Sequence, residues 1–439
     1  MKLPTISCIE RYFEFEALGA NWKTEILAGV TTFMTMAYIV FVNPSILAET
    51  GMPLTAVVAA TCLASAFGSL MMGIVARYPI ALAPGMGLNA YFTYTVVKGM
   101  GVSWQAALGA VFISGVAFLL LTAIGVRQLI VSAIPTELYS AVGAGIGLFI
   151  ALVGFRNSGI IVPSASTTVT LGNLRDPNTL LAMFGLVLIG ALMAWRVRAA
   201  MLLGILGVTG VGAALGLVHW QPHAYRLSDI TGTAFKLDLN ATFKLGALEI
   251  IFVFLFVDLF DNVGTLVAVG KKAGLFNKTH QIPRVNRILV SDATATIAGA
   301  LSGTSTVVSY IESAAGVVAG GRTGVTAIVT GLLFLAALFI APVIGVIPAA
   351  ATAPALIVVG CMMMTAIGEI DWNDPVSAIS AFLTMSAIPL TFSIANGLAF
   401  GFTSYTLLKL ASGQGRKVSW LVYVLTALFI LRFLYLATG

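Results

Sequence analysis

Apolar stretches of about 20 residues recur along the whole chain, and each is long enough to cross a bilayer as an α-helix. The 439 residues are 59% hydrophobic and only 9% charged, whereas a soluble domain carries about 25% charged residues. This deficit excludes a soluble enzyme with a single membrane anchor. We therefore predict an all-α polytopic membrane protein without a sizeable soluble domain.

The apolar pattern is interrupted by two polar stretches. Residues 158–175 are rich in Ser and Thr, and residues 219–243 are polar, so both are expected to form external loops. The stretch 375–410 fits either two helices or one broken helix. The other spans are expected at 24–47, 54–76, 80–97, 103–126, 135–155, 178–196, 199–217, 245–269, 287–303, 305–320, 325–346, 350–366 and 418–437.

The Lys and Arg residues that give the chain a net charge of +6 lie mainly in the predicted loops, so they indicate membrane orientation rather than nucleic-acid binding. The largest basic cluster lies between two spans, which places its loop in the cytoplasm. It consists of Lys271, Lys272, Lys278, Arg284 and Arg287. Residues 1–22 lack the apolar core of a signal peptide and are expected to form a short cytoplasmic amphipathic helix.

Cysteine and histidine spacings predict neither a disulfide framework nor a metal site. Cys8, Cys62 and Cys361 form no CxxC or other paired pattern. His219 and His223 are four residues apart, but no carboxylate accompanies them in a helix. We therefore expect no metal and no other cofactor.

One predicted span, 245–269, carries two carboxylates, Asp258 and Asp261, which are three residues apart and so lie on one helical face. A carboxylate at membrane depth costs roughly 2.5 to 3.5 kcal/mol on insertion scales. This cost predicts a function for at least one acid. The alternative is a structural carboxylate that accepts hydrogen bonds from Ser, Thr or the backbone, and both interpretations also apply to Glu312, the single charged residue in the span 305–320.

Two spans begin with residues that disfavour a continuous helix. The span 80–97 opens with Pro84, Gly85 and Gly87, and the span 305–320 opens with Thr, Ser and Val residues. In each we expect a short extended segment followed by a half-helix. The alternative is that Pro and Gly only kink packed helices.

The two interrupted spans are followed by similar residues. Gly101–Ser103 resembles Gly324–Thr326, and the offset of 324 − 101 = 223 pairs Asn89 with Glu312. Seven spans separate the halves, an odd number, so a repeat would be inverted in the membrane. Paired interruptions of this kind point to the central site of a transporter, and half-helix N-termini there would offer backbone N–H groups to a ligand.

Several strings resemble a known family. The strings APGMGLNAYF (83–92), FVDLFDNVGT (256–265) and TSTVVSYIESAAG (304–316) are similar to the AzgA-like hypoxanthine/adenine/guanine permeases of the nucleobase–cation symporter-2 family. The string IPLTFSIANGLAFG (388–401) also resembles that branch, and the similarity covers nearly the whole chain.

The resemblance implies a UraA-like fold of 14 transmembrane segments in two inverted repeats of seven, with short strands in segments 3 and 10. It implies a core domain that moves against a gate domain. On this chain, a cytoplasmic N-terminal segment would cover 1–22, the core 23–130 and 244–346, and the gate 131–243 and 347–439.

The resemblance further implies a multi-pass transporter of the cytoplasmic (inner) membrane, not an enzyme, that imports adenine, guanine or hypoxanthine with protons, often as a homodimer through the gate.

The resemblance also implies which residues form the site. Asp261 and Glu312 resemble acids that contact substrate, and Tyr310 resembles an aromatic residue of uracil-transporting relatives. Ser313 follows Glu312 where the wider family usually has Asn, which argues against uracil or xanthine. The expected substrate-binding residues are Asp261, Glu312, Tyr310, Asn89, Gly87, Leu88, Ser309 and Thr32. The expected proton-coupling residues are Asp261, Glu312 and Asp258.

Two other functions are weighed. An anion carrier of the same architecture would bind sulfate or bicarbonate, but two acids beside the site repel such ligands. A membrane enzyme could hold magnesium through Asp258 and Asp261, but that chemistry needs more acids and usually a second acid-rich motif, which the sequence lacks.

Overall fold

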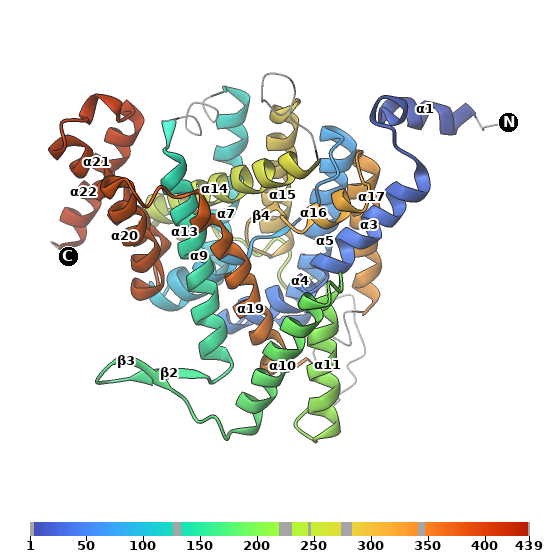
Figure 1. The fold of residues 1–439 in the computed structure, drawn as a ribbon, viewed down its shortest axis with the longest axis horizontal. Helices are drawn as coiled ribbons and strands as arrows, with labels where there is room; N and C mark the ends of the chain where they lie inside the picture. Colours follow the sequence, from blue (N-terminus) through green and yellow to red (C-terminus); the bar gives the residue numbers. More distant parts are fainter. Residues whose placement is uncertain are drawn as a thin grey trace. The chain divides into compact units, whose positions relative to one another are not determined.

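The computed structural model describes residues 4–125, 133–218, 231–244, 247–273, 283–340 and 347–437 (Figure 1). It is mostly helical, which confirms the predicted helical membrane fold. Within the described ranges, six helical segments are long and apolar enough to cross a membrane. They are Trp22–Thr50, Leu54–Ala76, Trp104–Ala123, Thr136–Asn157, Pro177–Ala194 and Ala349–Glu369.

The chain divides into two compact units. The first comprises Met1–Leu120 and Phe155–Ala355, and the second comprises Leu121–Gly154 and Leu356–Gly439. These units are defined by contacts within the structure, whereas the predicted core and gate domains are defined by movement against each other. The core and gate ranges therefore stay a prediction, and so does the number of 14 transmembrane segments.

The first unit contains the N-terminal helices, both interrupted spans and a hairpin. Its elements are α1 (Pro4–Tyr12), α2 (Phe15–Leu18), α3 (Trp22–Met36), α4 (Ile39–Leu47), η1 (Ala48–Thr50), α5 (Leu54–Met71), η2 (Met72–Ala76), β1 (Leu82–Pro84), α6 (Met86–Ala90), η3 (Tyr91–Gly99), most of α7 (Trp104–Ala123), β2 (Ile161–Ser164), β3 (Thr168–Leu171), α10 (Pro177–Ala194), α11 (Ala200–Ala214), α13 (Leu239–Lys244), α14 (Ala247–Ala273), α15 (Val285–Ser302), β4 (Val307–Ser309), α16 (Ser313–Val318), α17 (Gly324–Ala337) and η4 (Leu338–Ile340).

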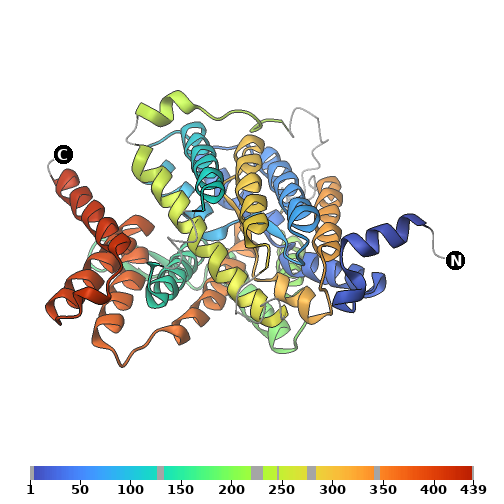
Figure 2. The same ribbon diagram turned by 90° about the horizontal axis from the view of Figure 1, so that it is seen from above.

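Helix α5 lies among the elements that surround the interrupted spans. It packs against α15 and α17 and also contacts β1 and β4, while α3 packs against α16 and α17 (Figure 1). Seen from above, α15 runs beside α5 (Figure 2). An apolar cluster joins the strand residues Leu82 and Val307 to Met72 and Ile288, all at most 1% exposed.

Close contact between α17 and η2, which directly follows α5, depends on glycine. A Cβ atom built on Gly324 would lie 2.0 Å from the backbone oxygen of Gly73, and one built on Gly73 would lie 2.6 Å from the backbone oxygen of Gly324. Small residues at such positions let membrane helices approach until their backbones touch. These two glycines therefore fix the spacing of the helices behind the site.

The second unit is helical throughout its described part. It contains most of α9 (Thr136–Asn157), the later half of α19 (Ala349–Met363), η5 (Met364–Glu369), α20 (Pro375–Thr391), α21 (Ile394–Ala411), η6 (Gly415–Lys417) and α22 (Trp420–Ala437). Two helices thus fill 375–410. The break lies at Phe392, whose φ of 50° is left-handed, and Ser393 caps α21 by accepting from the Asn396 N–H.

The segment 158–175, predicted to form an external loop, contains an antiparallel hairpin of β2 and β3 between α9 and α10, and its position outside the membrane stays a prediction. Ile, Val and Thr residues in both strands favour the extended backbone. The polar loop predicted at 219–243 is described only from residue 231 onward. Lys278 of the basic cluster and His219, His223 and His280 lie outside the described residues.

Candidate functional site

Strands β1 and β4 pair inside the first unit although they are far apart in sequence. They are antiparallel, with Leu82 opposite Ser309 and Pro84 opposite Val307. The ladder continues beyond both strands, because the Gly85 N–H donates to the Thr306 oxygen at 2.9 Å and the Tyr310 N–H donates to the Ala81 oxygen at 3.0 Å. The predicted extended segments in both interrupted spans are confirmed.

Local sequence explains why each helix starts where it does. Gly85 is extended and forms the N-cap of α6, directly after Pro84, which ends the strand. After β4, the helical turn begins at Glu312, the N-cap of α16, and its side chain makes no capping hydrogen bond. Because α16 has only six residues, the site is built here from side chains rather than from a helix dipole.

The two acids singled out from the sequence lie near each other. Asp261 comes from α14 and Glu312 from the start of α16, two helices that pack together. Their carboxyl groups are close enough to interact electrostatically. Both side chains are partly exposed, and among the described residues neither acid has a Lys or Arg partner.

Two tyrosine hydroxyls accompany this acid pair. Tyr310 is 5% exposed, and its hydroxyl donates to the Pro84 oxygen at 2.6 Å, which adds a side-chain tie between the strands. Tyr38 is 1% exposed, and its hydroxyl donates to Glu312 Oε1 at 2.7 Å. The sequence analysis missed Tyr38, which lies 274 residues from Glu312.

Three other expected site residues carry a buried polar atom that has no hydrogen-bond partner among the described residues. These atoms are Asn89 Nδ2, Ser309 Oγ and Thr32 Oγ1, in residues that are at most 2% exposed. Burying a polar atom unpaired costs about 1 to 3 kcal/mol, so each such atom needs an explanation. A polar ligand that supplies the missing partners is one.

Two of these residues contact the segments around β4: Asn89 contacts Ser305, which precedes β4, and Thr32 contacts α16, which follows it. Asn89, on α6, accepts a hydrogen bond from Ser305 through Oδ1, so its amide orientation is fixed. Thr32, on α3, lies against Gly316, where a Cβ atom would come 2.0 Å from Thr32 Oγ1. Gly87 and Leu88 are also buried in α6. The pairing of Asn89 with Glu312 by sequence offset is not matched by position in the helices, because Glu312 caps α16 and Asn89 lies inside α6.

Asp258, by contrast, belongs to a closed hydrogen-bond cluster. Asn262 Nδ2 donates to Asp258 Oδ1 at 2.6 Å and to Asp292 Oδ2 at 2.7 Å, and Asn262 Oδ1 accepts from the Ser309 N–H at 2.9 Å. All four residues are at most 2% exposed. One amide therefore ties α14, α15 and β4 together. The sequence analysis gave no role to Asn262 or Asp292, although an acid in the span 287–303 was a usable signal.

Comparison with known proteins places the chain among permeases. A model of the permease family matches residues 23–400. The guanine/hypoxanthine permease PbuG of Bacillus subtilis is 46% identical over 441 residues, covering 98% of this chain and 100% of that protein. The adenine permease AdeP of Escherichia coli is 42% identical over 428 residues, covering 98% of this chain and 96% of that protein.

The fold has a solved counterpart in the transmembrane domain of the cyanobacterium bicarbonate transporter BicA. The two match with a TM-score of 0.61 at 16% identity, over 86% of this chain and 96% of that one, so the likeness concerns the fold alone.

The alternative of a magnesium-dependent membrane enzyme is set aside, because the matched family and relatives are permeases. The chain belongs to the nucleobase–cation symporter-2 family of permeases, as its motifs predict, and is a multi-pass membrane transporter.

Proposed function

We propose that the protein imports a purine nucleobase (adenine, guanine or hypoxanthine) together with protons across the cytoplasmic membrane. The names of its relatives PbuG and AdeP support the substrate class. The observation that carries the proposal is the meeting of Asp261 and Glu312, two acids without a cationic partner among the described residues, beside the paired strands. Purine rings carry N–H donors in one plane, and carboxylates accept such donors.

In this proposal the two acids hold the ring by its N–H groups. Glu312 and Asp261 accept from ring nitrogens or from an exocyclic amino group. Asn89, Ser309 and Thr32 would gain partners for their unpaired polar atoms from the remaining polar edge. The Tyr310 ring would contact a face of the base, and Gly87 and Leu88 would form part of the wall.

We assign the coupled proton to Asp261 in the first place. Glu312 already accepts from Tyr38, and Asp258 accepts from Asn262, whereas no hydrogen bond to the Asp261 side chain is found in the described part of the chain. Asp261 is therefore free to bind a proton or the base without breaking an existing contact. Asp258 acts in this account through the cluster around Asn262. Movement of a core against a gate, and a homodimer through the gate, complete the proposal.

Uptake of radiolabelled hypoxanthine and adenine, with and without a protonophore, tests the transport function in cells that lack other purine carriers. We expect uptake that the protonophore abolishes. Uptake that resists the protonophore would reject proton coupling, and no uptake above that of empty cells would reject the purine assignment.

The remaining alternative is an anion carrier. The similarity to BicA shows that an anion transporter can have this fold, but at 16% identity it says nothing of the binding site. Two carboxylates near one another disfavour a bound sulfate or bicarbonate by charge repulsion. An excess of either anion should leave purine uptake unchanged. Competitive inhibition by bicarbonate at constant pH would favour the anion carrier.

A further inference from the structure

Tyr38 occupies the point where the first membrane span is interrupted. Helix α3 ends at Met36 and α4 begins at Ile39, so Tyr38 lies in the junction between them. The side chain is 1% exposed, and its hydroxyl donates to Glu312 Oε1 at 2.7 Å. Helix α3 also packs against α16, the helix that Glu312 caps, so the first span contacts this acid both through Tyr38 and through its neighbouring helix.

We propose that Tyr38 is a specificity-determining residue that occupies one acceptor position of Glu312 Oε1, so that this oxygen is a weaker acceptor than Oε2 for a second N–H donor of the purine. The inference rests on the proposed purine function. It adds a residue and a rule for selectivity that the functional assignment does not contain.

The rule follows from the chemistry of the carboxylate. A carboxylate with both oxygens open accepts two parallel N–H donors side by side, as in its pairs with Arg. Guanine offers such a pair, the ring N1–H and the neighbouring 2-amino group, whereas hypoxanthine has only the N1–H at that edge. With Oε1 engaged by the phenol, the second donor of guanine meets an oxygen that already accepts a charge-assisted hydrogen bond. The site thus gives guanine little advantage over hypoxanthine at Glu312.

Removing the hydroxyl should change this balance. Tyr38→Phe frees Oε1 while it keeps the ring that packs between the helices. We expect the ratio of guanine affinity to hypoxanthine affinity to rise about ten-fold, the value of one hydrogen bond to a charged group. Because both affinities are measured on the same preparation, a loss of folded protein cancels in the ratio.

The matched control is Tyr78→Phe. Tyr78 is also buried, at 2% exposed, and its hydroxyl donates to the Pro283 oxygen at 2.6 Å rather than to Glu312. Dissociation constants for tritiated guanine and hypoxanthine are measured on purified wild type and both variants. The control should keep the wild-type ratio within about two-fold.

The outcomes separate the two levels of the account. A wild-type protein that binds neither purine rejects the proposed function, and the inference with it. If the wild type binds, then an unchanged ratio in Tyr38→Phe, an equal change in Tyr78→Phe, or loss of both ligands by Tyr38→Phe overturns the inference and leaves the proposed function standing. Only a selective gain for guanine in Tyr38→Phe supports it.

Discussion

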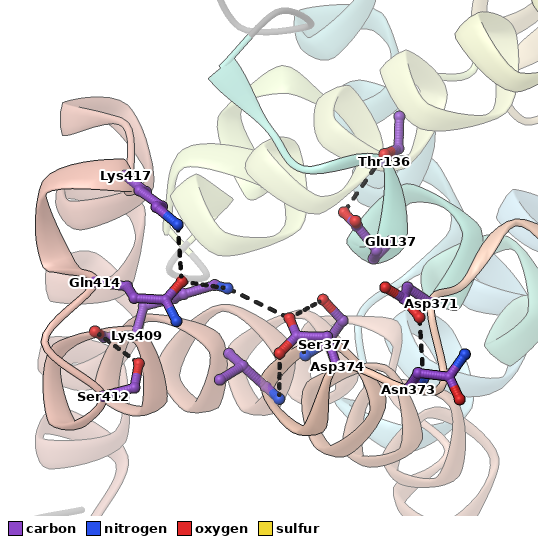
Figure 3. A network of polar contacts seen from close by, with 11 residues as sticks. Thr136, Glu137, Asp371, Asn373, Asp374, Ser377, Lys409, Ser412, Gln414 and Lys417 are labelled. Carbon is purple, nitrogen blue, oxygen red and sulfur yellow. Dashed lines mark hydrogen bonds and ion pairs between the residues drawn. The ribbon is translucent and has the colours of Figure 1, made fainter.

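Two kinds of carboxylate can be compared between the units. Asp374, in the second unit, caps α20 through the N–H groups of Val376 and Ser377, and Lys409 Nζ lies 3.3 Å from its Oδ2 (Figure 3). Asp261 and Glu312, in the first unit, lie near each other without a Lys or Arg partner in the described ranges. The comparison teaches that an acid with a cap and a cation is structural, whereas two neighbouring acids without a cation in the described part of the chain, of which Glu312 alone accepts from the Tyr38 hydroxyl, are suited to bind a ligand.

The first unit also contains a buried acid of the structural kind, which sharpens the comparison. Glu25 is 0% exposed and accepts from the backbone N–H groups of Arg322 and Thr323 and, at 2.6 Å, from Thr326 Oγ1. These donors lie at the start of α17, so Glu25 fastens α3 to that helix end. Burial alone therefore does not separate the functional acids from the structural ones.

The largest expected effect is on purine uptake by Glu312→Ala. Loss of a carboxylate that holds the base removes charge-assisted hydrogen bonds worth about 1.5 to 3 kcal/mol each, so uptake at low substrate should fall about 100-fold. The melting temperature should fall less than that of Glu25→Ala, since the Glu312 side chain makes no capping hydrogen bond and only the Tyr38 hydroxyl loses its acceptor. Wild-type uptake by Glu312→Ala would break the comparison.

The next effect is expected from Asn262→Ala, which removes the amide that joins two acids to the Ser309 N–H. Leaving buried groups unpaired costs about 1 to 3 kcal/mol per group, and β4 loses its fastening beside Glu312. The Michaelis constant for hypoxanthine should rise about ten-fold. Asn43→Ala is the control, because Asn43 is also a buried amide donor, to Thr61 and Thr304. An equal rise in the Michaelis constant of the control would remove the special role of Asn262.

Glu25→Ala should change stability rather than transport. The N–H groups at the start of α17 lose their acceptor, which costs about 2 to 3 kcal/mol and lowers the melting temperature. The Michaelis constant per folded transporter should stay unchanged. A melting temperature equal to that of the wild type, together with lost purine affinity, would show that the comparison assigned Glu25 to the wrong class.

The smallest effect concerns Asp374. The Ser377 hydroxyl, the Lys409 ammonium and the Val376 N–H hold the pKa of this carboxyl below its ordinary value. A lowered folded-state pKa gives stability that is present at neutral pH and is lost as the pH falls below about 3.9, the usual Asp value, through the folded pKa. At pH 7 the free energy of unfolding of Asp374→Asn should therefore be lower than that of the wild type by about 1 kcal/mol or less, and its melting temperature should be correspondingly lower. The gap should narrow as the pH falls below about 3.9, and a constant gap would contradict this cause.

Local patterns in the sequence were enough to predict the two interrupted spans. Pro84, Gly85 and the Val307-Val308 pair act on the backbone beside them, so the strands could be predicted. The contacts of Tyr38 and Asp292 could not, because their partners are 274 and 30 residues away, and no local periodicity encodes such pairs. For the same reason the sequence placed Asp258 and Asp261 in one motif without showing that only Asp258 faces the Asn262 amide.

Thermal unfolding of the purified protein with adenine, guanine or hypoxanthine tests the central claim most directly. A ligand at 100 times its dissociation constant stabilises the folded state by about 2.7 kcal/mol. We predict that at least one of these purines raises the melting temperature of the wild type and of Glu25→Ala, and that none raises that of Glu312→Ala. A wild type that no purine stabilises, or a Glu312→Ala variant stabilised as much as the wild type, would contradict the account.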